Sequence, residues 1–401
     1  MTRVFSIICF FICSTMLNSL SANGTEIRTT DLSFYSEHLT VTYNPEMVFD
    51  FKIRPGKYDW SSQKYNLREF YELLESKDYQ RLLSKLENYR DQFELNDWLY
   101  YELIQKSVAH IFDGFSPQHQ TLVCWLLLNK SGFDARITYL KKELFLNVYS
   151  NDEIFEVPLI EEDGKSFVNI TAANAGEKLI ETLYATDFTP NPNGRNFSFD
   201  LVKFPKLRPQ TSTREVEFSD DFLNYKMNIE FDETIIRLMQ DYPSFAENKY
   251  LELPLSKTLS SSIIPILRDI IKEKSNRKAL ETLVAFTRTA FLYKADEEVY
   301  GKSKPMIPDE LFHYKFSDCE DRSALFYNLV KELLDLPMIV VAFPDHVTVA
   351  VATSEPLGDA IVFNGKNYYI CDPTGPEDSS QIGFLPDEYA DKPFEIIARY
   401  R

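Results

Sequence analysis

Three residues in the second half of the chain have the types and the order that thiol-based acyl chemistry requires. Cys319 stands where a helix is expected to begin, His346 follows 27 residues later, and Asp372 follows a further 26 residues on. A thiolate can attack a carbonyl carbon, an imidazole can accept and return the proton, and a carboxylate can orient the imidazole. The set predicts a nucleophilic site at which an acyl group is transferred through Cys319.

The residues around Cys319 predict that the thiol lies in the first turn of a helix. Asp318 is a good N-cap, and Asp321 three residues later completes an approximate capping box. Unpaired backbone N–H groups and the positive end of the helix favour the thiolate there. Glu320 and Asp321 oppose this effect by raising the pKa of the thiol, so activation would need a cationic or basic partner.

His346 is the strongest candidate for the base among the five histidines. It begins an expected strand in which valines alternate onto one face, while His346 shares the opposite face with Thr348. Two carboxylates compete to orient its ring. Asp345 is the neighbouring residue, so in an extended chain it points to the other face, whereas Asp372 ends a strand and is well placed to reach the ring.

These segments together resemble the transglutaminase-like superfamily of papain-like cysteine enzymes, of the exported bacterial type. The matching segments are 318–323 with the helix that follows, the His346 strand, and 369–374. The resemblance implies an α+β fold with helices packed on an antiparallel sheet. It also implies that Cys319 is the acyl-accepting nucleophile, His346 the general base and acid, and Asp372 the residue that orients the imidazole.

The resemblance also bears on which groups would stabilise the oxyanion and on which molecule would accept the acyl group. The backbone N–H of Cys319 is the expected oxyanion donor, and Tyr314 is a candidate for the second. All three tryptophans lie in the first half, so the tryptophan beside the site in animal transglutaminases has no counterpart in the second half. We therefore expect hydrolysis of an amide or peptide bond rather than protein crosslinking.

The expected elements occur in a similar order in both halves. The first half predicts strands at 39–43 and 48–53, helices at 67–95, 98–112 and 121–128, then strands at 137–140, 144–149 and 167–170. The second half predicts a short apolar segment at 251–253, helices at 263–273, 278–293 and 320–334, then strands at 338–343, 347–352 and 368–372.

This repetition predicts an internal duplication. Residues 125–133 match residues 328–336, an offset of 203 that places Cys319 on Ser116, His346 on Glu143 and Asp372 on Asn169. Only the second half then keeps a reactive set. The predicted organisation is a signal peptide at 1–22, a degenerate half at 23–188, a linker rich in Pro, Asn, Ser and Thr at 189–212, and a transglutaminase-like domain at 213–401.

The N-terminus predicts export. A short n-region containing Arg3 precedes an apolar run at 4–17, and the small residues at 19–21 suit cleavage near Ala22, which implies a secreted or periplasmic protein. The mature chain would keep three cysteines, an odd number that leaves at least one thiol free. Strand alternation turns Cys371 away from the side of Asp372 and predicts a packed core thiol.

Composition excludes several classes of protein. The net charge of −18 excludes a basic surface for nucleic acid, and 44% hydrophobic residues suffice for large cores. We expect no cofactor, because the sequence has no phosphate-binding glycine loop, and no metal, because no set of ligands has a typical spacing. No segment after the signal is long enough to span a membrane.

The expected partner is a protein, a peptide or an amide-containing component of the cell envelope. The alternative is a non-catalytic scaffold that binds a peptide or a glycan in aromatic clefts and carries a vestigial triad. One further hypothesis concerns the long connection 294–318 before Cys319, which contains Gly301 and Pro305 and could cover the site as a lid.

Overall fold

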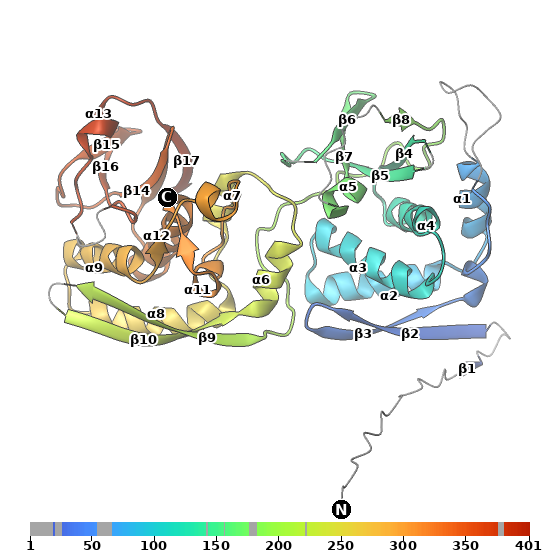
Figure 1. Cartoon of the computed structure of the whole chain (residues 1–401), viewed down its shortest axis with the longest axis horizontal. Helices are drawn as coiled ribbons and strands as arrows, with labels where there is room; N and C mark the ends of the chain where they lie inside the picture. The colour runs from blue at the N-terminus through green and yellow to red at the C-terminus, as the bar shows by residue number, and fades with distance from the viewer. Residues whose placement is uncertain are drawn as a thin grey trace, which may run out of the picture. The chain divides into compact units, whose positions relative to one another are not determined.

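The computed structural model describes residues 19–20, 26–53, 66–141, 143–155, 157–175, 183–220, 223–375 and 381–401. The described chain mixes helices with antiparallel sheets, which confirms the α+β class (Figure 1). It forms two compact units, the first from residues 1–34, 38–149 and 180–197 and the second from residues 35–37, 150–179 and 198–401. Of the predicted signal peptide only β1 (Ser19–Leu20) is described, and the rest, with the cleavage site, lies outside the described residues.

The first unit begins with a hairpin and continues as a series of helices. The hairpin consists of β2 (Glu26–Phe34) and β3 (Glu37–Tyr43) and is followed by the short helix η1 (Pro45–Met47). The helices are α1 (Leu67–Glu75), α2 (Gln80–Phe93), α3 (Asp97–Ile111) and α4 (Pro117–Lys130). Trp98 and Trp125 are buried in this unit, and the indole N–H of Trp125 donates to the backbone oxygen of Ala135 at 2.8 Å.

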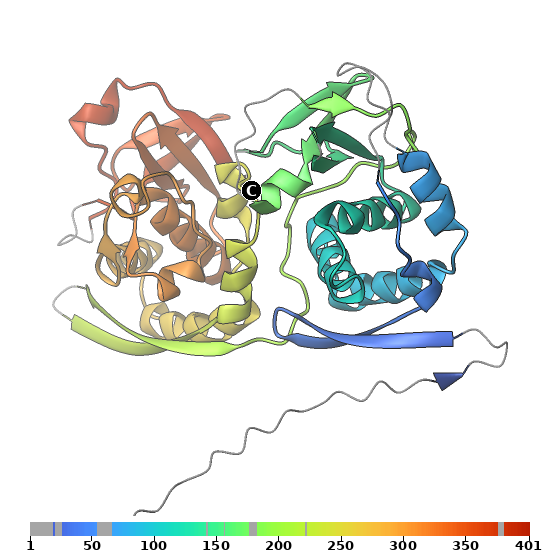
Figure 2. The same ribbon diagram turned by 45° about the vertical axis from the view of Figure 1, so that its right-hand side comes forward.

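The second unit also begins with a hairpin followed by helices. The hairpin pairs β9 (Thr211–Asp220) with β10 (Leu223–Asp232), and alternate residues are buried from Val216 to Asp220 and from Met227 to Phe231. The helices are α6 (Glu233–Gln240), α7 (Glu247–Glu252), α8 (Lys257–Ile271), α9 (Asn276–Thr289) and α12 (Cys319–Leu333). Helix α8 lies along the hairpin in both ribbon views (Figures 1 and 2). One continuous core joins this hairpin, these helices and one face of the sheet that follows α12.

Two five-stranded sheets have the same strand order. One has the order β15-β16-β14-β13-β17, and the other β6-β7-β5-β4-β8. The strands of the first are β13 (Met338–Phe343), β14 (His346–Val351), β15 (Ala360–Phe363), β16 (Lys366–Ile370) and β17 (Glu395–Tyr400). Those of the second are β4 (Ala135–Leu140), β5 (Glu143–Tyr149), β6 (Leu159–Glu162), β7 (Lys165–Asn169) and β8 (Tyr184–Ala185), with α5 (Ile170–Ala175) after β7.

The registers of corresponding hairpins match at nearly constant offsets. Leu140 pairs with Glu143 in the β4–β5 hairpin, and Phe343 pairs with His346 in the β13–β14 hairpin, an offset of 203. The second hairpin of each sheet corresponds at an offset of 201, because Glu162 pairs with Lys165 and Phe363 with Lys366. The predicted offset therefore holds up to His346. Between its two hairpins the second half is two residues shorter than the first half.

Helix α12 carries Cys319 and has well-defined ends. Its N-terminus has the predicted capping box, in which the Asp318 side chain accepts from the backbone of the third helical residue and the Asp321 side chain accepts from the Asp318 N–H. After the helix, Asp335 adopts the left-handed conformation, with φ of 53°, that often ends helices. The helix is buried along most of its length, which fixes Cys319 relative to the sheet.

Several predicted elements differ in the structure. Residues 48–53 form no strand, and the predicted helix 67–95 is two helices separated by a turn at Ser76. The segment 251–253 belongs to the end of α7 and its C-cap. The hairpin β2–β3 starts earlier than predicted, and β9 begins within the last two residues of the proposed linker, because these strands alternate polar and apolar residues and so lack a continuous apolar run.

The connection 294–318 contains short elements. They are α10 (Asp296–Val299), α11 (Glu310–His313) and β12 (Phe316–Ser317), which pairs in parallel with β11 (Leu292–Tyr293). Met306, Leu311 and Phe312 are buried in the core of the second unit, so this part of the connection could not open as a lid without exposing them. Among the described helices none combines the length and apolar character needed to cross a bilayer.

Candidate active site

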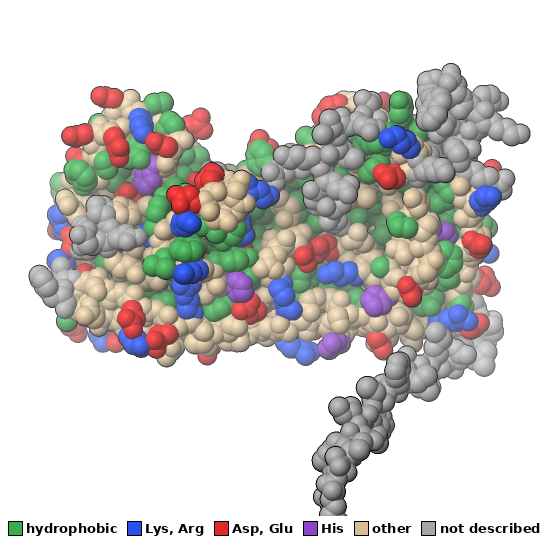
Figure 3. Space-filling model, in the orientation of Figure 1, with side chains coloured by type: hydrophobic (Ala, Val, Ile, Leu, Met, Phe, Trp, Pro, Cys, Tyr) green, Lys and Arg blue, Asp and Glu red, His purple; other side chains and the backbone are tan. Residues whose placement is uncertain are grey.

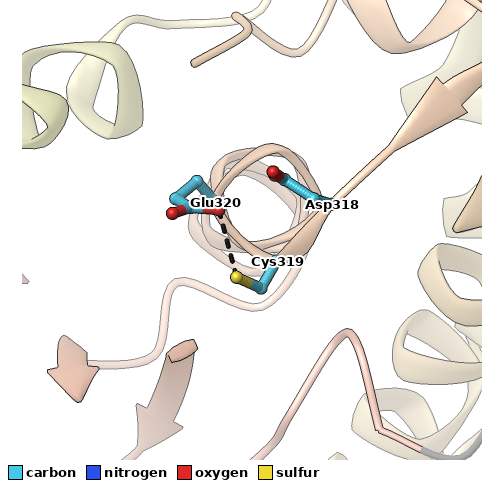
Figure 4. Close-up of side chains that lie close together, drawn as sticks. All are labelled: Asp318, Cys319 and Glu320. Atoms are coloured by element: carbon cyan, nitrogen blue, oxygen red, sulfur yellow. Dashed lines mark hydrogen bonds between the residues drawn. The ribbon is translucent and has the colours of Figure 1, made fainter. Parts of the chain in front are cut away.

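Cys319 is the first residue of α12, and its side chain is only 8% exposed. Its thiol donates a hydrogen bond to Oε2 of Glu320 at 3.0 Å, as Figure 4 shows. Burial, then the charge of Glu320 and this hydrogen bond, raise the pKa of the Cys319 thiol far above its ordinary value. The sequence predicted the acidic influence of Glu320 on this pKa, while the burial of the thiol, which adds to it, was not predicted.

The start of α12 lies against the strand that begins with His346. The backbone N–H of Val347 hydrogen-bonds to the Cys319 sulfur and partly lowers the pKa of its thiol. One turn further along the helix, the Ser323 hydroxyl donates to the backbone oxygen of Val347 at 3.2 Å. The sulfur therefore lies next to the residue that directly follows the candidate base.

His346 and Asp372 form the hydrogen-bonded pair that their order in the sequence predicts. Nε2 of His346 lies 3.0 Å from Oδ2 of Asp372, which leaves Nδ1 as the nitrogen that can exchange a proton with a reacting group. Burial lowers the pKa of His346, but the hydrogen bond and charge of Asp372 and the charge of Glu320 raise it, and the net pKa is above its ordinary value.

Asp372 is itself held firmly, two residues beyond the end of β16. Its Oδ1 accepts from the backbone N–H of Thr374 at 2.9 Å, and its backbone oxygen accepts from Nη2 of the buried Arg288 at 2.7 Å. Burial raises the pKa of Asp372, but the His346 and Thr374 hydrogen bonds and the charge of Arg288 lower it, and the net pKa is below its ordinary value. A side chain at Gly375 would overlap the Arg288 guanidinium and displace it from the Asp372 backbone oxygen.

The two other residues weighed for this region lie apart from the imidazole. Asp345 is exposed and its carboxylate pairs with Nζ of Lys392 at 2.9 Å, so it does not orient the ring through a hydrogen bond. Cys371 is fully buried, and burial raises the pKa of its thiol far above the ordinary value. This thiol packs in the core, as strand alternation predicted.

The second oxyanion donor suggested by the sequence, Tyr314, has a different neighbour. Its hydroxyl hydrogen-bonds to Nε2 of Gln240 at 2.9 Å, and Nζ of Lys304 lies 3.9 Å from the centroid of its ring. The tyrosine beside the start of α12 is Tyr293, which sequence reasoning missed. The signal that could have found it is the non-local pairing of β11 with β12, which no local pattern reveals.

Tyr293 pairs with Ser317, two residues before Cys319, in the parallel β11–β12 bridge. Its side chain is 45% exposed, and Cζ of Arg322 lies 5.2 Å from the centroid of its ring. Burial, then the acidic groups of Cys319, Asp318 and Glu320, raise the pKa of the Tyr293 hydroxyl to about 12. The phenol therefore stays protonated near neutral pH and can donate a hydrogen bond.

Carboxylates gather around the start of α12. One oxygen from each of Asp296, Asp318 and Asp321 lies within 4.8 Å of the others, and Asp318, Cys319 and Glu320 form a second such group, so both groups have the spacing to hold a metal ion. Backbone N–H groups already bond this cluster: Met306 donates to Asp321 at 2.8 Å. Burial raises the pKa of Asp296 to about 6 and that of Asp321 well above its ordinary value, so protons reduce the cluster's charge near neutral pH.

Comparisons of this chain with protein-family models, with curated proteins and with solved structures found no match. The functional assignment therefore depends on the site itself. Its components are a thiol at a helix start, an imidazole on the adjoining strand, and a carboxylate that binds the imidazole.

Proposed function

We propose that this protein is an exported, transglutaminase-like thiol enzyme that hydrolyses amide or peptide bonds through an acyl-enzyme on Cys319. The observation that carries the proposal is the 3.0 Å hydrogen bond between His346 and Asp372, next to a strand residue that contacts the Cys319 sulfur. Residues 26 apart in the chain meet there with the orientation that a general base and its orienting acid require. The antiparallel sheet behind helix α12 supports the same class of enzyme.

The reaction begins when the Cys319 proton passes to Nδ1 of His346 and the sulfur attacks the substrate carbonyl carbon. The carbonyl π electrons move to oxygen, then return as the carbon–nitrogen bond breaks and His346 protonates the leaving amine. Water then attacks the thioester and gives one proton to His346, which returns it to the sulfur as the acid departs. Asp372 holds the imidazole in one tautomer and stabilises its protonated form throughout.

The first half is proposed to be a degenerate copy of the second. The equal strand order and matching registers support a duplication, and Glu143 occupies the position of His346. The offset of 203 places Asn169 opposite Asp372, but the register of the second hairpin places Thr171 there. Ser116, at the position of Cys319, is the N-cap of α4, and its hydroxyl accepts from the His119 N–H. This half therefore keeps the architecture and lacks the triad.

The proposed partner is a protein, a peptide or another amide in an extracytoplasmic compartment, reached after removal of the signal peptide. Acidic side chains are frequent on the visible face over α13 (Asp387–Ala390) and β15 (Figure 3). Exposed Asp359, Asp387, Glu388 and Asp391 contribute to this surface. Neighbouring Tyr389 lies against His346, with ring centroids 5.3 Å apart, so the negative surface borders the proposed site and suits neutral or cationic substrates.

The test is acylation of the intact protein by p-nitrophenyl acetate, with the modified cysteine located by mass spectrometry. We expect the acetyl group on Cys319, at a rate above that of free cysteine with an equal thiolate fraction. His346→Ala should reduce this rate at least about tenfold, since general-base catalysis contributes that much or more. Asp345→Asn is the matched control and should react like the parent. Acylation no faster than free cysteine would contradict the proposal.

The scaffold alternative has one specific observation in its favour. Within the described residues the Cys319 thiol donates to Glu320 rather than to the imidazole, and its raised pKa disfavours the reactive thiolate. A cavity of about 750 Å³ in the second unit, lined by Phe204, Leu207, Ile235 and Leu255 among others, could receive a ligand without using the triad. A peptide or glycan that binds equally to the parent and to Cys319→Ala, with no turnover by either, would favour this alternative.

A further inference from the structure

We infer that Tyr293 is a further catalytic residue, whose hydroxyl donates a hydrogen bond to the oxyanion formed when Cys319 attacks a carbonyl. The inference rests on the proposed function, because it assigns the second donor of the same site. The first donor is the backbone N–H of Cys319, which occupies the first helical position and has no acceptor within the helix. The ring of Tyr293 lies where a second donor would be needed.

Three contacts fix that ring over the first turn of α12. Residue 293 pairs with Ser317 in the β11–β12 bridge, and the Lys294 N–H that follows donates to the Ser317 oxygen at 3.1 Å. Arg322 lies under the ring, and its guanidinium is itself held because Nη2 donates to the Phe291 oxygen at 2.7 Å. The backbone on both sides of Tyr293 is therefore tied to the start of the helix.

The helix geometry then brings Cys319 to the same side. Residues three apart in a helix are neighbours on its surface, so Cys319 and Arg322 occupy adjoining positions of the first turn. The ring that lies over Arg322 is therefore close to the turn that carries the thiol, and Cys319 is among the groups that raise the pKa of Tyr293. The Tyr293 ring is also 45% exposed while the sulfur is buried, so a carbonyl that approaches from solvent meets the phenol beside the sulfur.

The chemistry of the phenol suits this role. Burial, then the neighbouring acidic groups of Cys319, Asp318 and Glu320, raise the pKa of Tyr293 to about 12, which keeps its O–H proton in place as a donor. The same surroundings contain several carboxylates and disfavour a new negative charge. A neutral donor aimed at the oxyanion would offset part of that repulsion, which makes its loss costly for the acyl step.

The experiment compares two reactions of Cys319 in the intact protein at one pH. Acylation by p-nitrophenyl acetate forms the sulfur–carbon bond, places a negative charge on the carbonyl oxygen, and then expels p-nitrophenolate. Alkylation by iodoacetamide forms a sulfur–carbon bond as iodide leaves, with no oxyanion. Both need the thiolate, so the ratio of their rates cancels any change in thiol ionisation. Mass spectrometry restricts both rates to Cys319.

We expect Tyr293→Phe to lower the ratio of acylation to alkylation by about 100- to 1,000-fold, the range for loss of one oxyanion donor. Tyr314→Phe is the matched control and should leave the ratio unchanged, because the Tyr314 hydroxyl lies beside Gln240 of α6, from whose Nε2 it accepts a hydrogen bond. An unchanged ratio in Tyr293→Phe, with rapid acylation of the parent, would overturn this inference and leave the proposed function standing. Parent acylation no faster than free cysteine would overturn both.

Discussion

The contact between Cys319 and Glu320 controls the reactivity of the proposed nucleophile. The thiol is buried and donates a hydrogen bond to the Glu320 carboxylate. Both features favour the uncharged sulfur. In the proposed mechanism the thiol is therefore protonated in the free protein, and the adjoining imidazole removes the proton when substrate binds.

Replacing Glu320 with Gln should make Cys319 more reactive, because the substitution removes a negative charge next to the sulfur. Alkylation of Cys319 by iodoacetamide at pH 8 should be at least about fivefold faster, since one unit of thiol pKa changes the thiolate fraction about tenfold. Glu332→Gln, at an exposed position near the other end of the same helix, is the control. Equal rates for Glu320→Gln and the parent would refute the role given to Glu320.

Replacing Asp372 with Asn should lower the pKa of His346. Asp372 raises this pKa through its hydrogen bond and charge, while burial lowers it, so the net direction should reverse when the charge is removed. Titration of the imidazole by NMR should place the pKa above the ordinary value in the parent and below it in Asp372→Asn. Asp345→Asn should give a smaller decrease. An equal His346 pKa in the parent and in Asp372→Asn would show that the pair is not formed.

The order of residues predicted the His346–Asp372 pair but not the surroundings of the thiol. The pair could be predicted because strand alternation fixes which side chains share a face, and only one nearby acid satisfied that condition. Tyr293 and Tyr314 could not be distinguished in the same way, because their positions depend on a two-residue parallel bridge between segments far apart in the chain. The strength of the Glu320 effect depends on burial, which no local pattern gives.

At the scale of elements, helix α12 and its buried carboxylates form the support of the site. The helix and strands β13 and β14 agree with the predicted ranges because each has continuous apolar periodicity. The two long hairpins were missed or misplaced because their strands have one buried and one exposed face. A fold of this kind is predicted best where an element is buried on both sides.

The carboxylates beside α12 should make stability depend on pH. Burial, then Asp318, raise the pKa of Asp296 to about 6, so the folded protein gains stability below about pH 4 that is lost as the pH rises through 6. Asp296→Asn stays neutral and avoids that loss. Its free energy of unfolding relative to the parent should therefore increase by at least about 1 kcal/mol between pH 4 and pH 8, measured by urea denaturation.

The control for this experiment is Asp387→Asn, which removes a carboxylate at an exposed position of α13. Its stability relative to the parent should change little between the two pH values. If Asp296→Asn instead loses stability relative to the parent as the pH rises, then Asp296 is ionised in the folded state and stabilised by its surroundings.

At the scale of the whole molecule, the chain contains two compact units that each have a core. Leu126 in α4 and Leu329 in α12 are both fully buried and stand at the offset of 203 that relates the two helices. Each unit also contains a buried thiol outside the proposed triad that reports on its own packing. Cys124 lies in the first unit, and Cys371 lies in the second.

Cavity-forming substitutions should therefore act on one unit at a time. Leu126→Ala should lower the free energy of unfolding of the first unit by about 2–4 kcal/mol, so Cys124 should become accessible to pulsed alkylation at a lower urea concentration. The accessibility of Cys371 should change much less. Leu329→Ala should show the reverse pattern. Mass spectrometry resolves the two thiols in one sample. Equal shifts at both cysteines in both variants would mean that the chain unfolds as a single cooperative unit.

The burial of Cys319 also determines how the protein tolerates oxidants. Peroxides react with thiolates, so sulfenic acid forms slowly on a sulfur that stays protonated and enclosed. The other two thiols of the described chain are fully enclosed as well. In the exported enzyme that we propose, the contact with Glu320 would therefore protect the sulfur from oxidation as well as slow the proposed first chemical step.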